Sequence, residues 1–213
     1  KALHLGEVSA SGLEFDAVLL AVKSYDTEWC VKFIEPYLKP GGFIISAQNG
    51  INDDAIAGII GWTREVGCVV TLGAGMYGPG HAERTSAAGR PSFTVGEPSG
   101  MVTPRLESLV ELLGVIGPTK TTTNLWGYRW SKLATNSMSN AVAGMTGLTS
   151  AEVRQKPEPR GLSIAIAGEL LSVASALGVS VEPINGIPPA LFVEAVDDGA
   201  KREEVEQKMR EHG

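Results

Sequence analysis

The first third of the chain alternates continuous apolar runs with segments of helical periodicity, and this alternation restricts the fold more than any other feature. Three runs have the length and composition of strands buried on both faces, at residues 16–23, 43–47 and 64–72. Helical segments are predicted between them, at 26–38 and from Asp53 or Asp54 to Ile60. This order predicts a parallel sheet with crossover helices, in which ligands bind beyond the carboxyl ends of the strands.

The remainder of the chain predicts a change from sheet to helix near residue 123. A further strand is expected at 91–97, a helix at 103–113, and an edge strand or Thr-rich connection at 118–123. Helical segments are then expected at 124–143, 160–178, 188–197 and 201–211. The fold class is therefore α/β: a doubly wound parallel sheet in 1–123, followed by an all-helical domain in 124–213.

The stretch Gly73–Gly78 matches the dinucleotide-binding pattern GxGxxG, and Glu97 lies near the spacing of a ribose-binding acid. That motif requires a helix to open at its glycines, so that the pyrophosphate meets the amino end of the helix. Pro79-Gly80 follows instead, so we predict a hairpin or bend. Because only a strand or a loop is expected before residue 16, the sheet resembles the second half of a doubly wound domain.

Composition restricts the classes of partner. The formal net charge is −6 and Lys and Arg do not cluster, which argues against nucleic-acid binding. No apolar run approaches the roughly 20 residues that span a bilayer, and no cleavable signal is evident, so a cytoplasmic protein without membrane association is expected.

Metal and nucleophile chemistry find little support in the sequence. Cys30 and Cys68 are expected to be reduced core residues, and they lack zinc-site spacing. His4, His81 and His212 are scattered, and no serine lies in a nucleophile elbow. We therefore predict no metal site and no hydrolase triad.

One lysine and two asparagines are spaced four residues apart, as Lys132, Asn136 and Asn140. On a helix this spacing places one ammonium and two amides on one side. Such a group can hold a small oxo-acid, because the ammonium donates to a carbonyl oxygen as it gains charge and the amides fix the carboxylate or hydroxyl. A solvent-facing polar stripe is the alternative, although apolar neighbours predict a largely buried helix.

Together these motifs resemble the ketopantoate reductases (2-dehydropantoate 2-reductases), NADPH-dependent enzymes of pantothenate synthesis. The resemblance covers roughly residues 7–180, and the lysine with its two asparagines is its most specific part. Its motifs are Ala21-Val22-Lys23, Gln48-Asn49-Gly50-Ile51, Ala74 with Pro79-Gly80, Phe93-Thr94-Val95-Gly96-Glu97, and Trp130-Ser131-Lys132-Leu133 with Asn136 and Asn140.

The resemblance implies a Rossmann domain joined to a helical domain like that of 6-phosphogluconate dehydrogenases, with the substrate between them. It implies that Lys132 is the general acid, and that Asn136 and Asn140 bind the substrate. It also implies that Lys23, Asn49 and Ala74 contact the NADP cofactor near the nicotinamide. The residues themselves leave a strand-end lysine at 23 and a turn-forming asparagine at 49 as alternatives.

The chain departs from the family pattern at both ends. The amino-terminal GxGxxG segment of the family is missing, so we expect an incomplete chain or a missing cofactor half, and residues 181–213 show no counterpart of the family's serine-rich substrate loop. The predicted function is NADPH-dependent reduction of 2-dehydropantoate or a similar 2-oxo acid. The alternatives are a β-hydroxyacid or opine-type dehydrogenase, or a catalytically silent binding module.

A homodimer is also conceivable. Leu162, Ile166, Leu170 and Leu171 suit a dimer interface and a core equally well.

Overall fold

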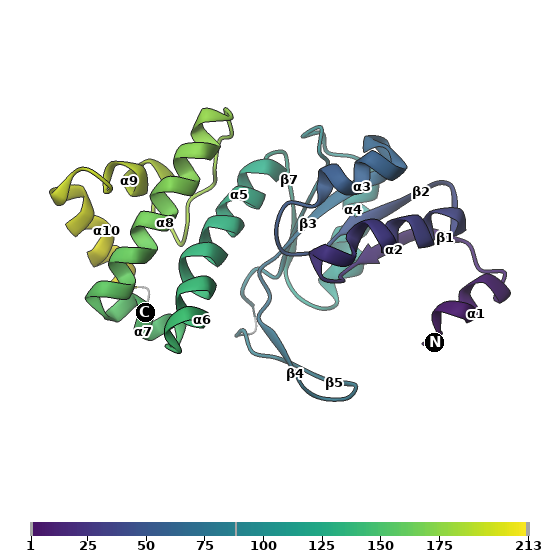
Figure 1. Ribbon diagram of the computed structural model, residues 1–213. Helices are drawn as coiled ribbons and strands as arrows, with labels where there is room; N and C mark the ends of the chain where they lie inside the picture. The colour runs from purple at the N-terminus through teal and green to yellow at the C-terminus, as the bar shows by residue number, and fades with distance from the viewer. Residues whose placement is uncertain (1, 88, 212–213) are drawn as a thin grey trace. The chain divides into compact units, whose positions relative to one another are not determined.

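The computed structural model describes residues 2–87 and 89–211, and the chain divides into two compact units, Lys1–Leu125 and Trp126–Gly213. The first unit contains a sheet with helices and the second is helical (Figure 1). The predicted fold class is thereby confirmed, with one change in the sheet. Of the three histidines, His212 lies outside the described residues.

The first unit is built on a five-stranded sheet in the order β1-β2-β3-β6-β7. Its strands are β1 (Phe15–Leu20), β2 (Leu38–Ser46), β3 (Glu65–Val70), β6 (Phe93–Gly96) and β7 (Thr119–Thr122). Strands β1, β2 and β3 pair in parallel, as predicted, and β6 pairs in parallel with β7. Strand β6 runs antiparallel to β3, so the sheet is mixed, whereas a parallel sheet was predicted.

A hairpin explains the reversal at β6. Between β3 and β6 the chain forms β4 (Ala74–Gly78) and β5 (His81–Arg84), which pair with each other in a separate two-stranded sheet. A parallel connection requires a crossover, usually a helix, and the described residues between β3 and β6 form no helix. The chain therefore re-enters the sheet in the opposite direction. The hairpin predicted at the glycine-rich stretch is confirmed.

Helices cover both faces of the sheet. They are α2 (Thr27–Ile34), flanked by 3₁₀ turns η1 (Ser24–Asp26) and η2 (Glu35–Tyr37); α3 (Asp53–Ile60), followed by η3 (Trp62–Arg64); and α4 (Pro104–Gly114). Adjacent residues of β2 face opposite sides, because side chains alternate along a strand. Ile44 joins the core beneath α2 and α3, whereas Ile45 joins the core beneath α4.

Two local expectations were wrong. The segment before β1 contains a helix, α1 (Leu5–Ala10). His4 is its N-cap residue, and the His4 ring nitrogen accepts a hydrogen bond from the amide of Gly6. The turn residues at 39–42 lie inside β2 rather than before it, because a bulge there shifts the register against β1. Helix α3 spans Asp53–Ile60, as expected, and Asn52 is its N-cap residue.

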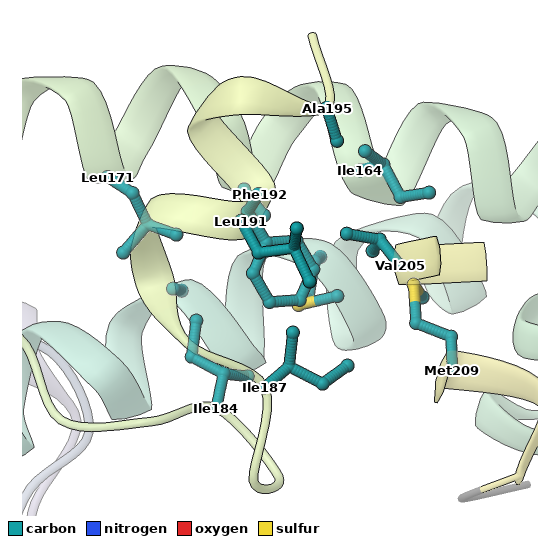
Figure 2. Close-up of a cluster of buried hydrophobic side chains, with 12 residues drawn as sticks. Ile164, Leu171, Ile184, Ile187, Leu191, Phe192, Ala195, Val205 and Met209 are labelled. Carbon is teal, nitrogen blue, oxygen red and sulfur yellow. The ribbon is translucent and has the colours of Figure 1, made fainter. Parts of the chain in front are cut away.

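The second unit consists of helices packed around one core. They are α5 (Leu125–Asn136), a π-helical turn η4 (Ser137–Ala141), α6 (Val142–Thr146), α7 (Ser150–Gln155), α8 (Pro157–Ala176), α9 (Pro189–Glu194) and α10 (Gly199–Glu211). Figure 2 shows Phe192, fully buried, among side chains from α8, α9, α10 and the loop before α9. Helix α7, which a capping box at Thr149 begins, was not predicted.

The leucines proposed for a dimer differ in burial. Leu171 is 2% exposed and belongs to the core of the second unit, whereas Leu162 is 40% exposed. Leu171 therefore serves the core, and dimerisation stays a prediction. Within residues 2–87 and 89–211, no helix has the combination of length and apolarity that crossing a bilayer requires.

The bulge in β2 leads to a test of the sheet. A Cβ atom on Gly42 would lie 2.7 Å from the carbonyl oxygen of Phe15, and a Cβ on Gly58 in α3 would meet nothing within 4 Å. We expect Gly42→Ala to lower the free energy of unfolding by about 1–3 kcal/mol, because backbone must move. Gly58→Ala, the matched control, should raise it by about 0.5–1 kcal/mol. Chemical denaturation measures both, and equal stabilities would contradict the bulge.

Candidate functional site

The first group of predicted site residues lies beyond the carboxyl ends of three adjacent strands. Lys23 follows β1, Asn49 follows β2 and Ala74 follows β3. Because these strands are parallel, all three ends belong to one edge of the sheet. This is the edge at which α/β sheets bind ligands. All three residues are exposed.

Gln48 holds the loops at this edge together, a role that the sequence analysis missed. Its side-chain amide is buried and donates to the carbonyl oxygen of Val22 at 2.8 Å and to the Thr27 hydroxyl at 2.9 Å. The loop after β2 is thus fixed to the loop after β1 and to the start of α2. A polar residue directly after a buried strand was the only sequence signal for this role.

A second set of bonds fixes the backbone at Asn49. The Ser24 hydroxyl and the Asn52 amide both donate to the carbonyl oxygen of Asn49, each at 3.1 Å. Asn52 also donates to the Ser24 hydroxyl at 3.2 Å. The segment around Asn49 is therefore a hydrogen-bonded turn, which agrees with the alternative of a turn-forming asparagine. These bonds fix the backbone that carries the Asn49 side chain.

The glycine-rich stretch has no helix at its end. Gly73–Gly78 leads into the hairpin, with Ala74 paired to Arg84. Glu97, whose spacing suggested a ribose contact, is 4% exposed and accepts hydrogen bonds from Thr103 and Arg105. Burial acts to raise the pKa of this carboxyl, but the bonds from Arg105 and Thr103 prevail and lower it. Glu97 thus has a structural ion pair.

The second group of predicted site residues lies on one continuous helical stretch of the other unit. Lys132 and Asn136 belong to α5 and are partly buried, and Asn140 belongs to η4 and is exposed. The amide of Asn140 donates to the side-chain oxygen of Asn136 at 3.4 Å. The two asparagines are therefore adjacent, which the four-residue spacing predicted.

The Lys132 ammonium is a better proton donor than a surface lysine. Burial lowers its pKa below the ordinary value, since removing water penalises the charged form. A desolvated ammonium can donate to an oxygen that gains negative charge, and amides on the same helical stretch can orient a neighbouring carboxylate. This is the chemistry expected from the sequence.

The structure groups the predicted site residues by unit. Lys23, Asn49 and Ala74 share one sheet edge of the first unit. Lys132, Asn136 and Asn140 share one helical stretch of the second. In the part of the chain that the structure describes, no three His, Cys, Asp or Glu residues gather as metal ligands would.

Comparisons with known proteins point to one family. Two family models, both described as ketopantoate reductase PanE/ApbA, match the chain: one at residues 4–100, and the model of the C-terminal part at residues 124–211. Between them they cover both units.

Individual relatives carry related names. The 2-dehydropantoate 2-reductase of Pyrobaculum aerophilum is 31% identical over 176 residues, which cover 82% of this chain and 56% of that protein. That of Aquifex aeolicus is 27% identical over 161 residues, which cover 74% and 51%. A crystal structure of a candidate ketopantoate reductase from Ralstonia solanacearum is 25% identical, with a TM-score of 0.75, and the match covers 96% of this chain and 64% of that one. The chain thus spans about half the length of these curated relatives.

The lowered pKa of Lys132 has a consequence for stability. Between the folded pKa and the ordinary lysine pKa of about 10.4, the unfolded state binds more protons, so this group makes stability rise with pH. We expect Lys132→Met to melt at a higher temperature than the wild type at pH 7, with the difference shrinking as the pH approaches 10. Thermal melts at several pH values measure this.

Lys39 provides a control, because its pKa is shifted in the direction opposite to that of Lys132. Its hydrogen bond to Asp16 raises the pKa of an exposed ammonium, so Lys39→Met should melt no higher than the wild type at pH 7. A Lys132→Met protein that is less stable at pH 7 would mean that the ammonium has a compensating partner.

Proposed function

This chain belongs to the ketopantoate reductase family, and we propose that it reduces 2-dehydropantoate, or a similar branched 2-oxo acid, to the 2-hydroxy acid with NADPH. The observation that carries the proposal is the partly buried Lys132 on the same helical stretch as the adjacent Asn136 and Asn140. The names of the relatives agree with this reaction class.

Lys132 is proposed as the general acid. Reduction places negative charge on the ketone oxygen of the substrate, and a positioned ammonium stabilises that charge and then delivers a proton to it. The pKa of Lys132 is lowered by burial, which brings it closer to the working pH and makes proton transfer easier. The neutral amine then regains a proton from solvent.

Asn136 and Asn140 are proposed to hold the substrate. An amide offers two N–H donors and one carbonyl acceptor, so it can bind either a carboxylate or a hydroxyl. The bond between the two side chains uses one donor of Asn140 and leaves its other N–H for a ligand. Fixing the carboxylate of a 2-oxo acid also fixes its ketone group, because the ketone carbon is bonded directly to the carboxylate carbon.

Lys23, Asn49 and Ala74 are proposed to line the nicotinamide end of the cofactor site. A bound NADPH would supply the hydride for the reduction. The fit rests on the exposed side chains of Lys23 and Asn49 at the carboxyl edge of the sheet, where the bonds from Gln48 and Ser24 hold their loops. The glycine-rich hairpin is given no role in phosphate binding, because its glycines do not open a helix.

The proposal predicts the effect of removing the lysine. Lys132→Ala should lower kcat for 2-dehydropantoate by about 10²- to 10⁴-fold, the usual contribution of a general acid. NADPH oxidation followed by absorbance measures this in the full-length gene product. The control is Lys201→Ala, which removes an exposed lysine paired with Glu194 in the same unit and should keep activity within about twofold.

A panel of substrates separates the alternatives. Turnover of other 2-oxo acids, with none of 2-dehydropantoate, would change the substrate. Turnover only when an amine is added would indicate an opine-type dehydrogenase. No turnover and no NADPH binding by the full-length protein would leave a binding module. A fully active Lys132→Ala protein would remove the lysine from the mechanism.

The same assay predicts a pH profile. Only the protonated Lys132 can donate, so kcat should fall as the pH rises through the pKa of this group in the enzyme–substrate complex. In the unliganded protein burial lowers this pKa, so the decline in kcat/KM should begin below the ordinary lysine pKa of about 10.4. A profile that is flat up to pH 10 would contradict general acid catalysis by this residue.

A further inference from the structure

The turn that carries Asn140 is wider than an α-helical turn. Residues Ser137–Ala141 form a π-helical turn between α5 and α6. Such a turn inserts one extra residue into an α-helix, and single π turns of this kind occur frequently at functional sites. In the sequence, the weak helix formers Asn136, Ser137, Ser139 and Asn140 are its main sign.

This extra residue changes the direction in which Asn140 points. Eight residues of ideal α-helix rotate through about 800°, so Asn140 would lie about 80° away from Lys132 around the axis. With one residue absorbed by the π turn, the same span rotates by about 700°, which leaves an offset of about 20°. The π turn therefore returns Asn140 to the side of the helix that carries Lys132.

At the end of the π turn the backbone bonding also departs from the α-helical pattern. In an α-helix the amide of Val142 would donate to the carbonyl of Met138, four residues earlier. Here it donates to the carbonyl of Ser139. A buried carbonyl needs a partner, and a buried peptide group without one costs about 1–3 kcal/mol.

Ser163 of α8 supplies that partner. Its hydroxyl donates to the Met138 carbonyl oxygen at 2.6 Å, and the serine is fully buried. The same hydroxyl lies 3.0 Å from the carbonyl of Pro159 in its own helix, but its single proton favours the shorter contact. The Met138 side chain belongs to the same hydrophobic core as Ile164, the neighbour of Ser163, and η4 packs against α8. The turn is therefore anchored to α8 by one hydrogen bond and by packing.

We propose that Ser163 is a positioning residue, which holds the π turn and so keeps Asn140 aligned with Lys132 and Asn136 for the 2-oxo acid. This inference rests on the proposed function, since it assigns Asn140 to substrate binding. Ser163 acts through Met138 and Asn140 rather than by touching the substrate.

The first test is structural and independent of activity. We expect Ser163→Ala to accelerate hydrogen exchange of the amides at 137–142 by about tenfold, because the turn loses its anchor. The matched control is Ser172→Ala in the same helix, whose hydroxyl donates to the Gly168 carbonyl of α8 at 2.8 Å. The control should leave exchange at 137–142 unchanged. Equal exchange in wild type and Ser163→Ala would overturn the inference.

The second test measures coupling between Ser163 and Asn140 in the full-length protein. Ser163→Ala should raise KM for the 2-oxo acid about tenfold and change kcat by less than about threefold, with the Kd for NADPH unchanged. In an Asn140→Ala background the same substitution should have no further effect on KM, because Asn140 no longer contributes. A tenfold rise in KM that persists without Asn140 would overturn the inference.

Ser163→Cys separates the lost hydrogen bond from lost packing. A thiol fills the space of the hydroxyl but donates weakly, so its KM should rise as in Ser163→Ala. Recovery of the wild-type KM would mean that packing, and not the bond, is what matters. A full-length wild type that turns over no 2-oxo acid overturns the proposed function and this role with it. Turnover that depends on Lys132 but is indifferent to Ser163 overturns this inference alone.

Discussion

The requirement that buried peptide groups be hydrogen-bonded governs both units of the chain. In the first unit it is met by the sheet ladders, and the parallel pairing of β1, β2 and β3 forces a helical crossover between each strand and the next. In the second unit a side chain fulfils this requirement. The Ser163 hydroxyl donates a hydrogen bond to the Met138 carbonyl oxygen, at the point where the α-helical pattern is interrupted. Each solution fixes the backbone beside a group of candidate site residues.

At the carboxyl ends of the strands, side-chain hydrogen bonds replace the backbone hydrogen bonds of the sheet. Beyond the last strand residues the ladders end, and Gln48 and Ser24 then join the loops to one another. The buried amide of Gln48 connects two loops across 26 residues of sequence. The exposed Lys23 and Asn49 thus lie on loops that are held by hydrogen bonds. A binding site needs such support in order to keep its side chains in fixed positions.

Periodicity predicted most of the fold because the elements that it found bury apolar faces. Strands β1 to β3 and helices α2, α3, α4 and α8 followed from such patterns. Helices α1 and α7 were missed because each is short, with a capping box and few or no buried residues. The apolar pattern could not predict the direction of β6, because a strand has the same composition in either direction. The hairpin between β3 and β6 sets this direction.

The candidate site was predictable in part for the same reason. Four-residue spacing predicted that Lys132, Asn136 and Asn140 share one side of a helix, and the adjacency of the two asparagines agrees with that prediction. Spacing alone carries no information about the π turn or about Ser163, which lies on another helix and meets Met138 only in the folded chain. The catalytic and binding roles of all six predicted residues stay predictions.

Because the polar groups of the second unit lie on one helical stretch, their mutual spacing is a property of local sequence. The segment 132–140 needs little from distant parts of the chain beyond a hydroxyl placed to receive one carbonyl. The segment 132–140 could therefore be transferred to another helical protein. A designed helical bundle that reproduced this segment on one helix, and a serine at the facing position of the next, would acquire an ammonium and two amides in register, without any cleft having been designed first.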